Sequence, residues 1–306
     1  MQIKNIVKYG FVAIAVAFMV YFLIKNWREV YIYNWNFNFH YLIISMLLLW
    51  IAMASATLMN KFIFAEIAGA QVGFWQMFRM YNISNLGRYL PGKVWSMLGL
   101  FYLASESGIK KRQTFLAVIA GEVAYKGSAI LIGVLFFFFS ATLKSYLPIM
   151  ILLFAALIIF VHPKILNRII NIGLKLLKKD RVEINFKYSS ILKYISLYFI
   201  VWILHSLAFY VFVNSIASTR DYNIVQFFTI MPLCWVVGYI MIFAPGGIGI
   251  REGMLVLILS EFLPPEVALV IAVLQRLWFI IVEALNAGIA LLIPTKVSLQ
   301  LRDQIS

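Results

Sequence analysis

Long apolar segments dominate the chain and predict membrane-spanning helices. A spanning helix needs about 20 mostly apolar residues, and six segments satisfy this: 6–24, 41–61, 113–139, 146–161, 194–213 and 266–293. The first segment follows two lysines, as a secretion signal would, but it lacks a clear small-residue cleavage site and is long enough to span. We therefore interpret it as a retained first helix.

Two further apolar stretches, 79–104 and 226–263, are interrupted in the middle. The first contains NLGRYLPGKVW at 85–95, and the second contains APGGIGIREG at 244–253. Proline and adjacent glycines end a helix, and irregular backbone at membrane depth is tolerated only where protein or water surrounds it. Each stretch is therefore predicted to be a re-entrant hairpin. For the second, a complete crossing by residues 226–244 stays open as an alternative.

The order of these elements repeats along the chain. Two spans, a hairpin and a span occupy about 1–140, and the same series occupies about 141–306. Three spans in the first half force the second half into the opposite orientation, which is the inverted repeat of many secondary transporters. Pro91 and Gly92 lie 154 residues before Pro245 and Gly246. The sequence thus predicts one all-α integral membrane domain over 1–306, with about six full spans and two re-entrant hairpins.

Composition and charge agree with a membrane location. Apolar residues make up 63% of the 306 positions and charged residues 12%, against about a quarter charged in soluble domains. With the amino terminus inside, seventeen of the 26 lysines and arginines fall on the inner side and four on the outer side, as the positive-inside rule requires. Both termini are predicted to be cytoplasmic. The net charge of +14 then reflects topology and anionic lipid contact, not nucleic-acid binding.

The connector at 164–193 carries eight of these basic residues. Apolar residues such as Leu166, Ile170 and Leu177 recur there at helical spacing, which is typical of an amphipathic helix on the inner surface. A solvated basic connector is the alternative interpretation. The single cysteine, Cys234, gives neither a disulfide within the chain nor a metal site of paired cysteines.

Several charged residues lie in or beside the apolar segments. A charge at the centre of a spanning helix costs at least about 2.5 to 3.5 kcal/mol, so it usually faces a cavity or a partner. Glu122 and Lys126 are four residues apart and can form an ion pair or take part in transport. Arg276 is seven residues before Glu283, so it is expected to pair with Glu283, to pair with Glu122, or to contact a substrate.

The interrupted segments place basic residues where half-helices begin. Free backbone NH groups and the helix dipole attract an anion at such a terminus, so the two interruptions are candidate halves of a phosphate cradle. The alternative is that the glycines allow tight packing while the basic side chains extend to the interface. The candidate lipid-phosphate residues are Arg88, Pro91, Gly92, Lys93, Pro245, Gly246, Gly247, Arg251 and Arg276. The candidate embedded or coupling charges are Glu122, Lys126, Glu252 and Glu283.

These motifs together resemble the transmembrane flippase domain of the lysylphosphatidylglycerol synthase family. The resemblance rests on NLGRYLPGKVW, Glu122, APGGIGIREG and Arg276 in that order, and it covers nearly the whole chain. It implies a bacterial or archaeal inner-membrane domain that translocates lipids with charged head groups. The family's synthases carry a soluble aminoacyl-transferase domain after the membrane part, whereas this sequence stops at Ser306, so a stand-alone member is expected. Where an acid followed by arginine is expected, this chain has Glu122 and Val123.

The expected function is binding and translocation of an anionic lipid, either a phospholipid or a polyprenyl-phosphate-linked saccharide. The alternatives are a membrane-embedded transferase and a scaffold for envelope-synthesis enzymes, which would also be partners. A transferase needs a general base or metal ligands near the lipid head, and no such grouping is found, so neither catalysis nor a cofactor or metal is expected. His205, the one deep histidine, is interpreted as a hydrogen-bonded packing residue, with a proton relay as the alternative. The sequence does not indicate an oligomeric state.

Overall fold

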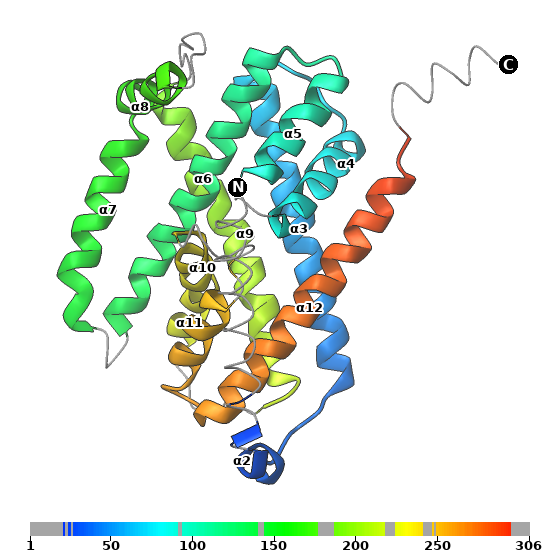
Figure 1. The fold of residues 1–306 in the computed structure, drawn as a ribbon, viewed down its shortest axis with the longest axis vertical. Coiled ribbons are helices and arrows are strands. Elements are labelled where there is room, and N and C mark those ends of the chain that lie inside the picture. Colours follow the sequence, from blue (N-terminus) through cyan, green and yellow to red (C-terminus); the bar gives the residue numbers. More distant parts are fainter. Residues whose placement is uncertain are drawn as a thin grey trace, which may run out of the picture.

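The structure is a computed structural model that describes residues 21, 24–25, 27–90, 94–139, 144–176, 187–217, 224–240, 247 and 249–294. All regular secondary structure within these ranges is helical, which confirms the predicted all-α class. The helices form an elongated bundle (Figure 1). Pro91, Gly92, Lys93, Pro245 and Gly246 lie outside the described residues.

Four helices are long and apolar enough to cross a membrane. They are α3 (Phe39–Ile67), α6 (Lys111–Phe139), α9 (Tyr188–Asn214) and α12 (Pro265–Leu292). At 1.5 Å per residue each is about 40 Å long, which exceeds the roughly 30 Å hydrocarbon core of a bilayer. These helices match four of the six predicted spans and extend beyond most of their predicted ends.

The other two predicted spans are not confirmed. Segment 6–24 lies almost entirely outside the described residues. Segment 146–161 forms α7 (Leu147–Val161), which follows a short 3-10 turn, η2 (Lys144–Tyr146). With 15 residues, α7 is about 22 Å long, so helix length alone does not establish a crossing.

Pairs of short helices replace the two interrupted stretches. The first pair is α4 (Phe74–Asn85), extended by the 3-10 turn η1 (Leu86–Tyr89), and α5 (Trp95–Glu106). The second pair is α10 (Ile224–Ile240) and α11 (Ile250–Leu259). The boundary between the two helices of each pair overlaps the predicted interruption, although the first stretch begins at Phe74 and not at residue 79. In Figure 1 the first pair lies in the upper half of the bundle and the second in the lower half.

The order of a long helix, a short pair and a long helix therefore occurs twice, as α3 to α6 and as α9 to α12, with η2, α7 and α8 between the two series. Each short pair packs against the long helix that closes the other half: α4 contacts α12, and α10 contacts α6. Among the described elements, α3 and α9 share the most extensive contact. Because of these contacts between the two halves, the end of η1 and the start of α11 lie toward the middle of the bundle.

Two apolar cores flank that middle region. One core joins α9, α10, α11 and α12, and the other joins α3, α4, α5, α6 and α9. Along α9 the second core ends at Val201 and the first begins at Ala208. Trp202 and His205 lie on the helix between them, at the level where the functional side chains gather.

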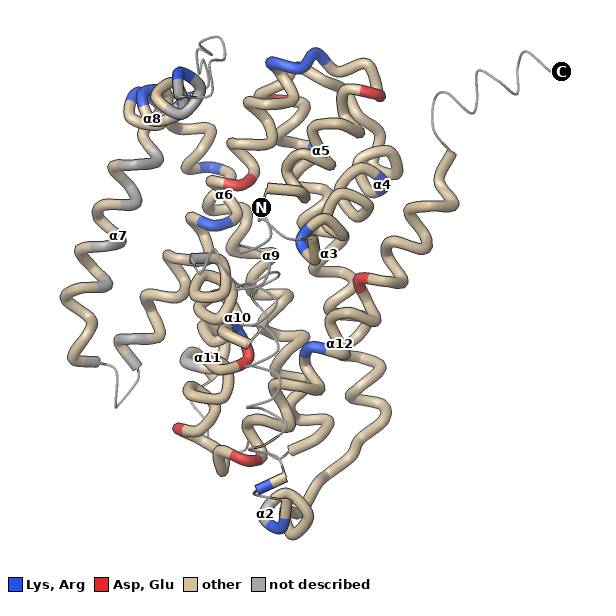
Figure 2. The backbone as a smooth tube through the Cα atoms, in the orientation of Figure 1, with Lys and Arg blue, Asp and Glu red and all other residues tan. Residues whose placement is uncertain are grey.

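The connector predicted at 164–193 begins with helix α8 (Pro163–Leu176). Lys164, Arg168 and Lys175 on this helix are exposed. Figure 2 shows the basic residues of α8 at the same end of the bundle as those between α5 and α6, whereas α2 (Trp27–Ile32) lies at the opposite end. The described part of the connector is thus a helix on the surface of the basic end of the bundle, as the amphipathic interpretation expects. Residues 177–186 are not described.

Candidate functional site

A cavity of about 480 Å³ lies between α4 with η1, α5, α6, α8, α9, α10 and the start of α11. Its charged lining residues are Arg88, Glu122, Lys126 and Arg251. Aromatic rings form much of the remaining wall: Tyr81, Tyr125, Trp202, Trp235 and Tyr239. The cavity therefore combines several charges with extended apolar surface.

Arg251 is a buried cation in the first turn of α11. Only 3% of its surface is exposed, and its Nε and Nη2 atoms have no hydrogen-bond partner within the described part of the chain. Its guanidinium carbon lies 4.3 Å from the ring centre of Trp235 and 5.2 Å from that of Phe279. Cation–π contact contributes about 2 kcal/mol when desolvated, but it leaves the NH donors unsatisfied and the charge unpaired.

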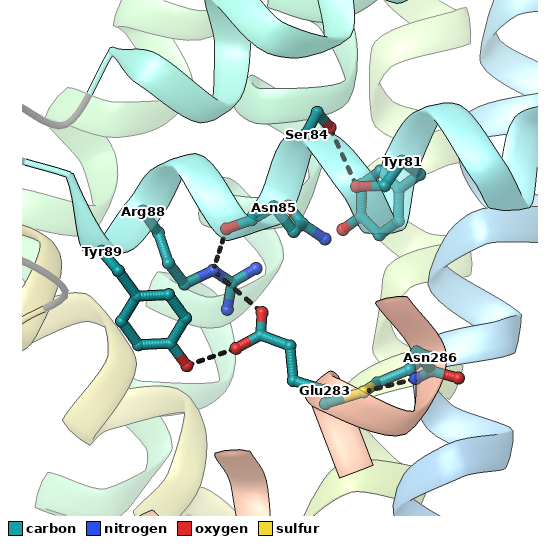
Figure 3. A network of polar contacts seen from close by, with 8 residues as sticks. Tyr81, Ser84, Asn85, Arg88, Tyr89, Glu283 and Asn286 are labelled. Atoms are coloured by element: carbon teal, nitrogen blue, oxygen red, sulfur yellow. Dashed lines mark hydrogen bonds and ion pairs between the residues drawn. The ribbon is translucent and has the colours of Figure 1, made fainter. Parts of the chain in front are cut away.

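Arg88 lies on η1 and does have an acidic partner (Figure 3). Its Nε is 3.3 Å from Glu283 Oε1 and donates to the backbone carbonyl of Asn85 at 3.1 Å. The hydroxyl of Tyr89 donates to the other oxygen of Glu283. Glu283 comes from α12, so the packing of α4 on α12 assembles this group of residues.

Arg276 on α12 pairs with Glu252 on α11, at 3.3 Å between Nη1 and Oε1. The second oxygen of Glu252 accepts a 2.7 Å hydrogen bond from the backbone NH of Gly249, so this carboxylate also caps the start of α11. The sequence considered Glu283 or Glu122 as the acid for Arg276, and both alternatives are wrong for the described structure. The reason is that α11 folds back against α12 and delivers a nearer acid.

Glu122 and Lys126 form the ion pair that their spacing on α6 allows. Lys126 Nζ also lies 3.6 Å from the ring centre of Tyr239. Both side chains are partly exposed at the cavity wall. The two residues therefore neutralise each other as an ion pair. Because both also line the cavity, they can contact a molecule bound there.

Gly247 is buried with φ of 72°. A Cβ atom at this position would come within 3.3 Å of the backbone of Gly238, and one on Gly238 would come within 3.2 Å of Arg251 Cβ. Only glycine adopts such a φ without strain. Gly247 thus lets the chain pass close to α10, which agrees with the tight-packing interpretation of the glycines.

His205 packs among aromatic rings, as expected of a packing residue. It stacks on Trp202 and Phe279, with ring centres 5.7 and 5.9 Å away, and meets Trp235 edge-on. Contrary to the expected hydrogen bond, its Nε2 is buried without a partner in the described residues. The Nε1 of Trp235 is likewise unpartnered there. Unsatisfied donors and acceptors therefore concentrate around this site.

Sequence reasoning missed the aromatic part of the site. Trp235 and Phe279 contact both Arg88 and Arg251. A usable signal was present for Phe279, because it precedes Glu283 by four residues and so shares its helix face. Within the described ranges, no group of three His, Cys, Asp or Glu side chains could hold a metal ion.

Comparison with curated proteins gives no match. In contrast, residues 5–284 match the family described as the lysylphosphatidylglycerol synthase TM region. That match spans nearly the whole sequence and confirms the resemblance carried by the two interrupted motifs. With four helices long enough to cross a bilayer, the chain is a multi-pass membrane protein that belongs to the lysylphosphatidylglycerol synthase transmembrane-region family.

Proposed function

We propose that this protein binds the phosphate of an anionic lipid in the cavity beside Arg251 and translocates that lipid across the membrane. The observation that carries the proposal is Arg251 itself, a cation that is 97% buried yet forms no ion pair within the described residues. An uncompensated buried charge is strongly destabilising. A bound anion removes that penalty.

The charges around the cavity support a monoanionic ligand. Glu283 is taken by Arg88, Glu252 by Arg276, and Glu122 by Lys126. Arg251 has no acidic partner among the described residues, and its planar guanidinium group can bind a phosphate through two hydrogen bonds. Lys93, also expected to contact the phosphate, lies outside the described residues.

The cavity walls suit a lipid more than a free ion. Ile130, Leu166 and Ile169 line it together with the aromatic rings, so acyl or polyprenyl chains would meet apolar surface. The ligand class is a phospholipid or a polyprenyl-phosphate-linked saccharide. No covalent step is part of the proposal, and envelope-synthesis enzymes are the proposed neighbours.

The proposed membrane arrangement has six spans, with the pairs α4–α5 and α10–α11 as re-entrant hairpins of an inverted repeat. The two pairs lie in opposite halves of the bundle (Figure 1), and each contacts the long helix of the other repeat. We place the basic end of the bundle, with α8 and both termini, at the cytoplasmic face of a prokaryotic inner membrane. This follows the positive-inside rule.

The test is lipid binding by native mass spectrometry for Arg251→Ala and Arg251→Lys. A charge-assisted hydrogen bond contributes roughly 1.5 to 3 kcal/mol, so the alanine variant should bind phosphate-bearing lipids about tenfold or more weakly. Lysine restores the charge without the fork and should recover part of the loss. Arg168→Ala removes an exposed arginine of α8 that does not line the cavity and is the charge-matched control.

Unchanged preference for phosphate lipids over neutral lipids in Arg251→Ala would overturn the binding proposal. Transport is measured separately, with purified protein in sealed vesicles that carry a fluorescent phospholipid in one leaflet. Binding without transport would favour a scaffold. Chemical conversion of the lipid would identify a transferase instead.

A further inference from the structure

Arg88 lies between two cavities. It lines the 480 Å³ cavity together with Arg251, and it also lines a smaller cavity of about 40 Å³ together with Glu283 and His205. A water molecule needs roughly 10 to 15 Å³ of such space, so the small cavity has room for water beside the Glu283 carboxylate. The guanidinium of Arg88 therefore connects the proposed phosphate site to a buried acid.

The contact between Arg88 and Glu283 is a single-point interaction. Nε of Arg88 lies 3.3 Å from the carboxylate, whereas a strong charge-assisted hydrogen bond measures about 2.7 to 2.9 Å. The two Nη groups of Arg88 have no protein partner among the described residues. This arginine thus holds Glu283 loosely and keeps two donors available.

A phosphate beside Arg251 would compete with Glu283 for Arg88. Both guanidinium groups lie over the same Trp235 ring, at 4.3 Å for Arg251 and 5.4 Å for Arg88. When Arg88 turns to the phosphate, Glu283 loses its cation, and this side chain is only 6% exposed in the lipid-free structure. A buried carboxylate without a cation, next to a new negative charge, favours its protonated form.

We propose that Glu283 takes up one proton when a lipid phosphate binds Arg88 and Arg251. The inference rests on the proposed lipid site and adds its coupling ion. One lipid monoanion and one proton enter the site together, so the loaded site has the same net charge as the empty one. Translocation of this neutral pair is driven by a pH gradient and is insensitive to membrane voltage.

The groups around Glu283 leave His205 as the main competing proton acceptor. Within the described residues, α4 with η1 contributes Tyr81, Arg88 and Tyr89, α6 contributes Tyr125, and α9 contributes His205. The α3 wall is Ala52, Met53 and Ala56, and α10 contributes Trp235. On α11, Arg251 faces Phe279 and Glu252 pairs with Arg276, while α2 lies at the lower end of the bundle in Figure 1. Protonating His205 would add a cation beside two arginines, which favours Glu283 as the acceptor.

The test is calorimetric titration of the purified full chain with short-chain phosphatidylglycerol. Its phosphodiester stays ionised between pH 5 and 8, so protons counted from two buffers of different ionisation enthalpy belong to the protein. We expect about one proton taken up by the unmodified protein and none by Glu283→Gln. By linkage, affinity should fall by up to about tenfold per pH unit as the pH rises, and this slope should vanish in Glu283→Gln.

The chain offers a matched control in Glu66. Like Glu283, Glu66 pairs with a cation, Lys193 at 2.6 Å, and accepts from a tyrosine hydroxyl, Tyr194 at 2.6 Å, but it does not line the lipid cavity. Glu66→Gln should keep the full proton uptake. His205→Gln should keep it as well.

The outcomes separate the coupling from the lipid site. Lipid binding without proton uptake in the unmodified protein overturns the coupling and leaves the lipid site standing. Loss of uptake in His205→Gln, with uptake retained in Glu283→Gln, also overturns it. No lipid binding at any pH removes the proposed function. Infrared difference spectra of the unmodified protein give a measurement independent of variants: lipid addition should produce the carbonyl band of a protonated carboxylic acid, and its absence contradicts the proposal.

Discussion

Replacing Arg251 with methionine should stabilise the lipid-free protein while weakening lipid binding. Methionine has a similar length and no charge, and it can pack between Trp235 and Phe279. Each buried polar nitrogen without a partner costs about 1 to 3 kcal/mol, and Arg251 has two such atoms, Nε and Nη2. The cation–π contact with Trp235 returns about 2 kcal/mol. The balance lies between about 0 and 4 kcal/mol, so we expect the free energy of unfolding to rise by about 2 kcal/mol.

The measurement is thermal unfolding in detergent, followed by tryptophan fluorescence, with and without anionic lipid. Arg276→Met is the control, because Arg276 has an acidic partner. Its removal leaves Glu252 buried without that cation, which costs about 3 to 5 kcal/mol. The two identical substitutions should thus shift stability in opposite directions. If Arg251→Met destabilises the lipid-free protein as Arg276→Met does, Arg251 has a structural partner and the reasoning fails.

Two further predictions concern packing and orientation. Gly247→Val should lower stability by about 1 to 3 kcal/mol, because a φ of 72° strains a side chain and its Cβ would lie only 3.3 Å from the Gly238 backbone. The measurement is denaturation of purified Gly247→Val and of the control Gly253→Val, where a Cβ meets nothing within 4 Å. Single cysteines on α8 in a Cys234→Ala background should resist a membrane-impermeant reagent added to intact cells. Labelling at Arg168→Cys from outside would reverse the proposed orientation.

Hydropathy predicted the four long helices because a bilayer requires an uninterrupted apolar run, which is a local property of the sequence. The separation of α4 from α5 and of α10 from α11 was predictable for the same reason, since proline and glycine act on their own backbone. The partners of the embedded charges were different. The spacing rule found Glu122 and Lys126, which share a helix, whereas Arg276 and Glu252 are 24 residues apart and Tyr89 and Glu283 are 194 apart.

Those long-range contacts depend on how α4 and α11 pack against α12, which no local pattern encodes. The aromatic residues of the site could not be identified from the sequence for another reason. Phenylalanine, tyrosine and tryptophan occur throughout this sequence, as membrane interfaces and cores both favour them. Trp235 therefore did not stand out until the structure placed two arginines over its ring.

The position of Trp235 determines what the site looks like when no anion is present. Two guanidinium groups of like charge repel each other and would swing apart in an empty pocket. The indole, whose face is electron-rich, lies 4.3 Å from one guanidinium carbon and 5.4 Å from the other, and so holds both as a stand-in for a negative charge. An arriving phosphate then meets Arg251 already in position, and only Arg88 has to turn from Glu283, so less binding free energy is spent on arranging the cations. Trp235 is thus the residue that preorganises the site.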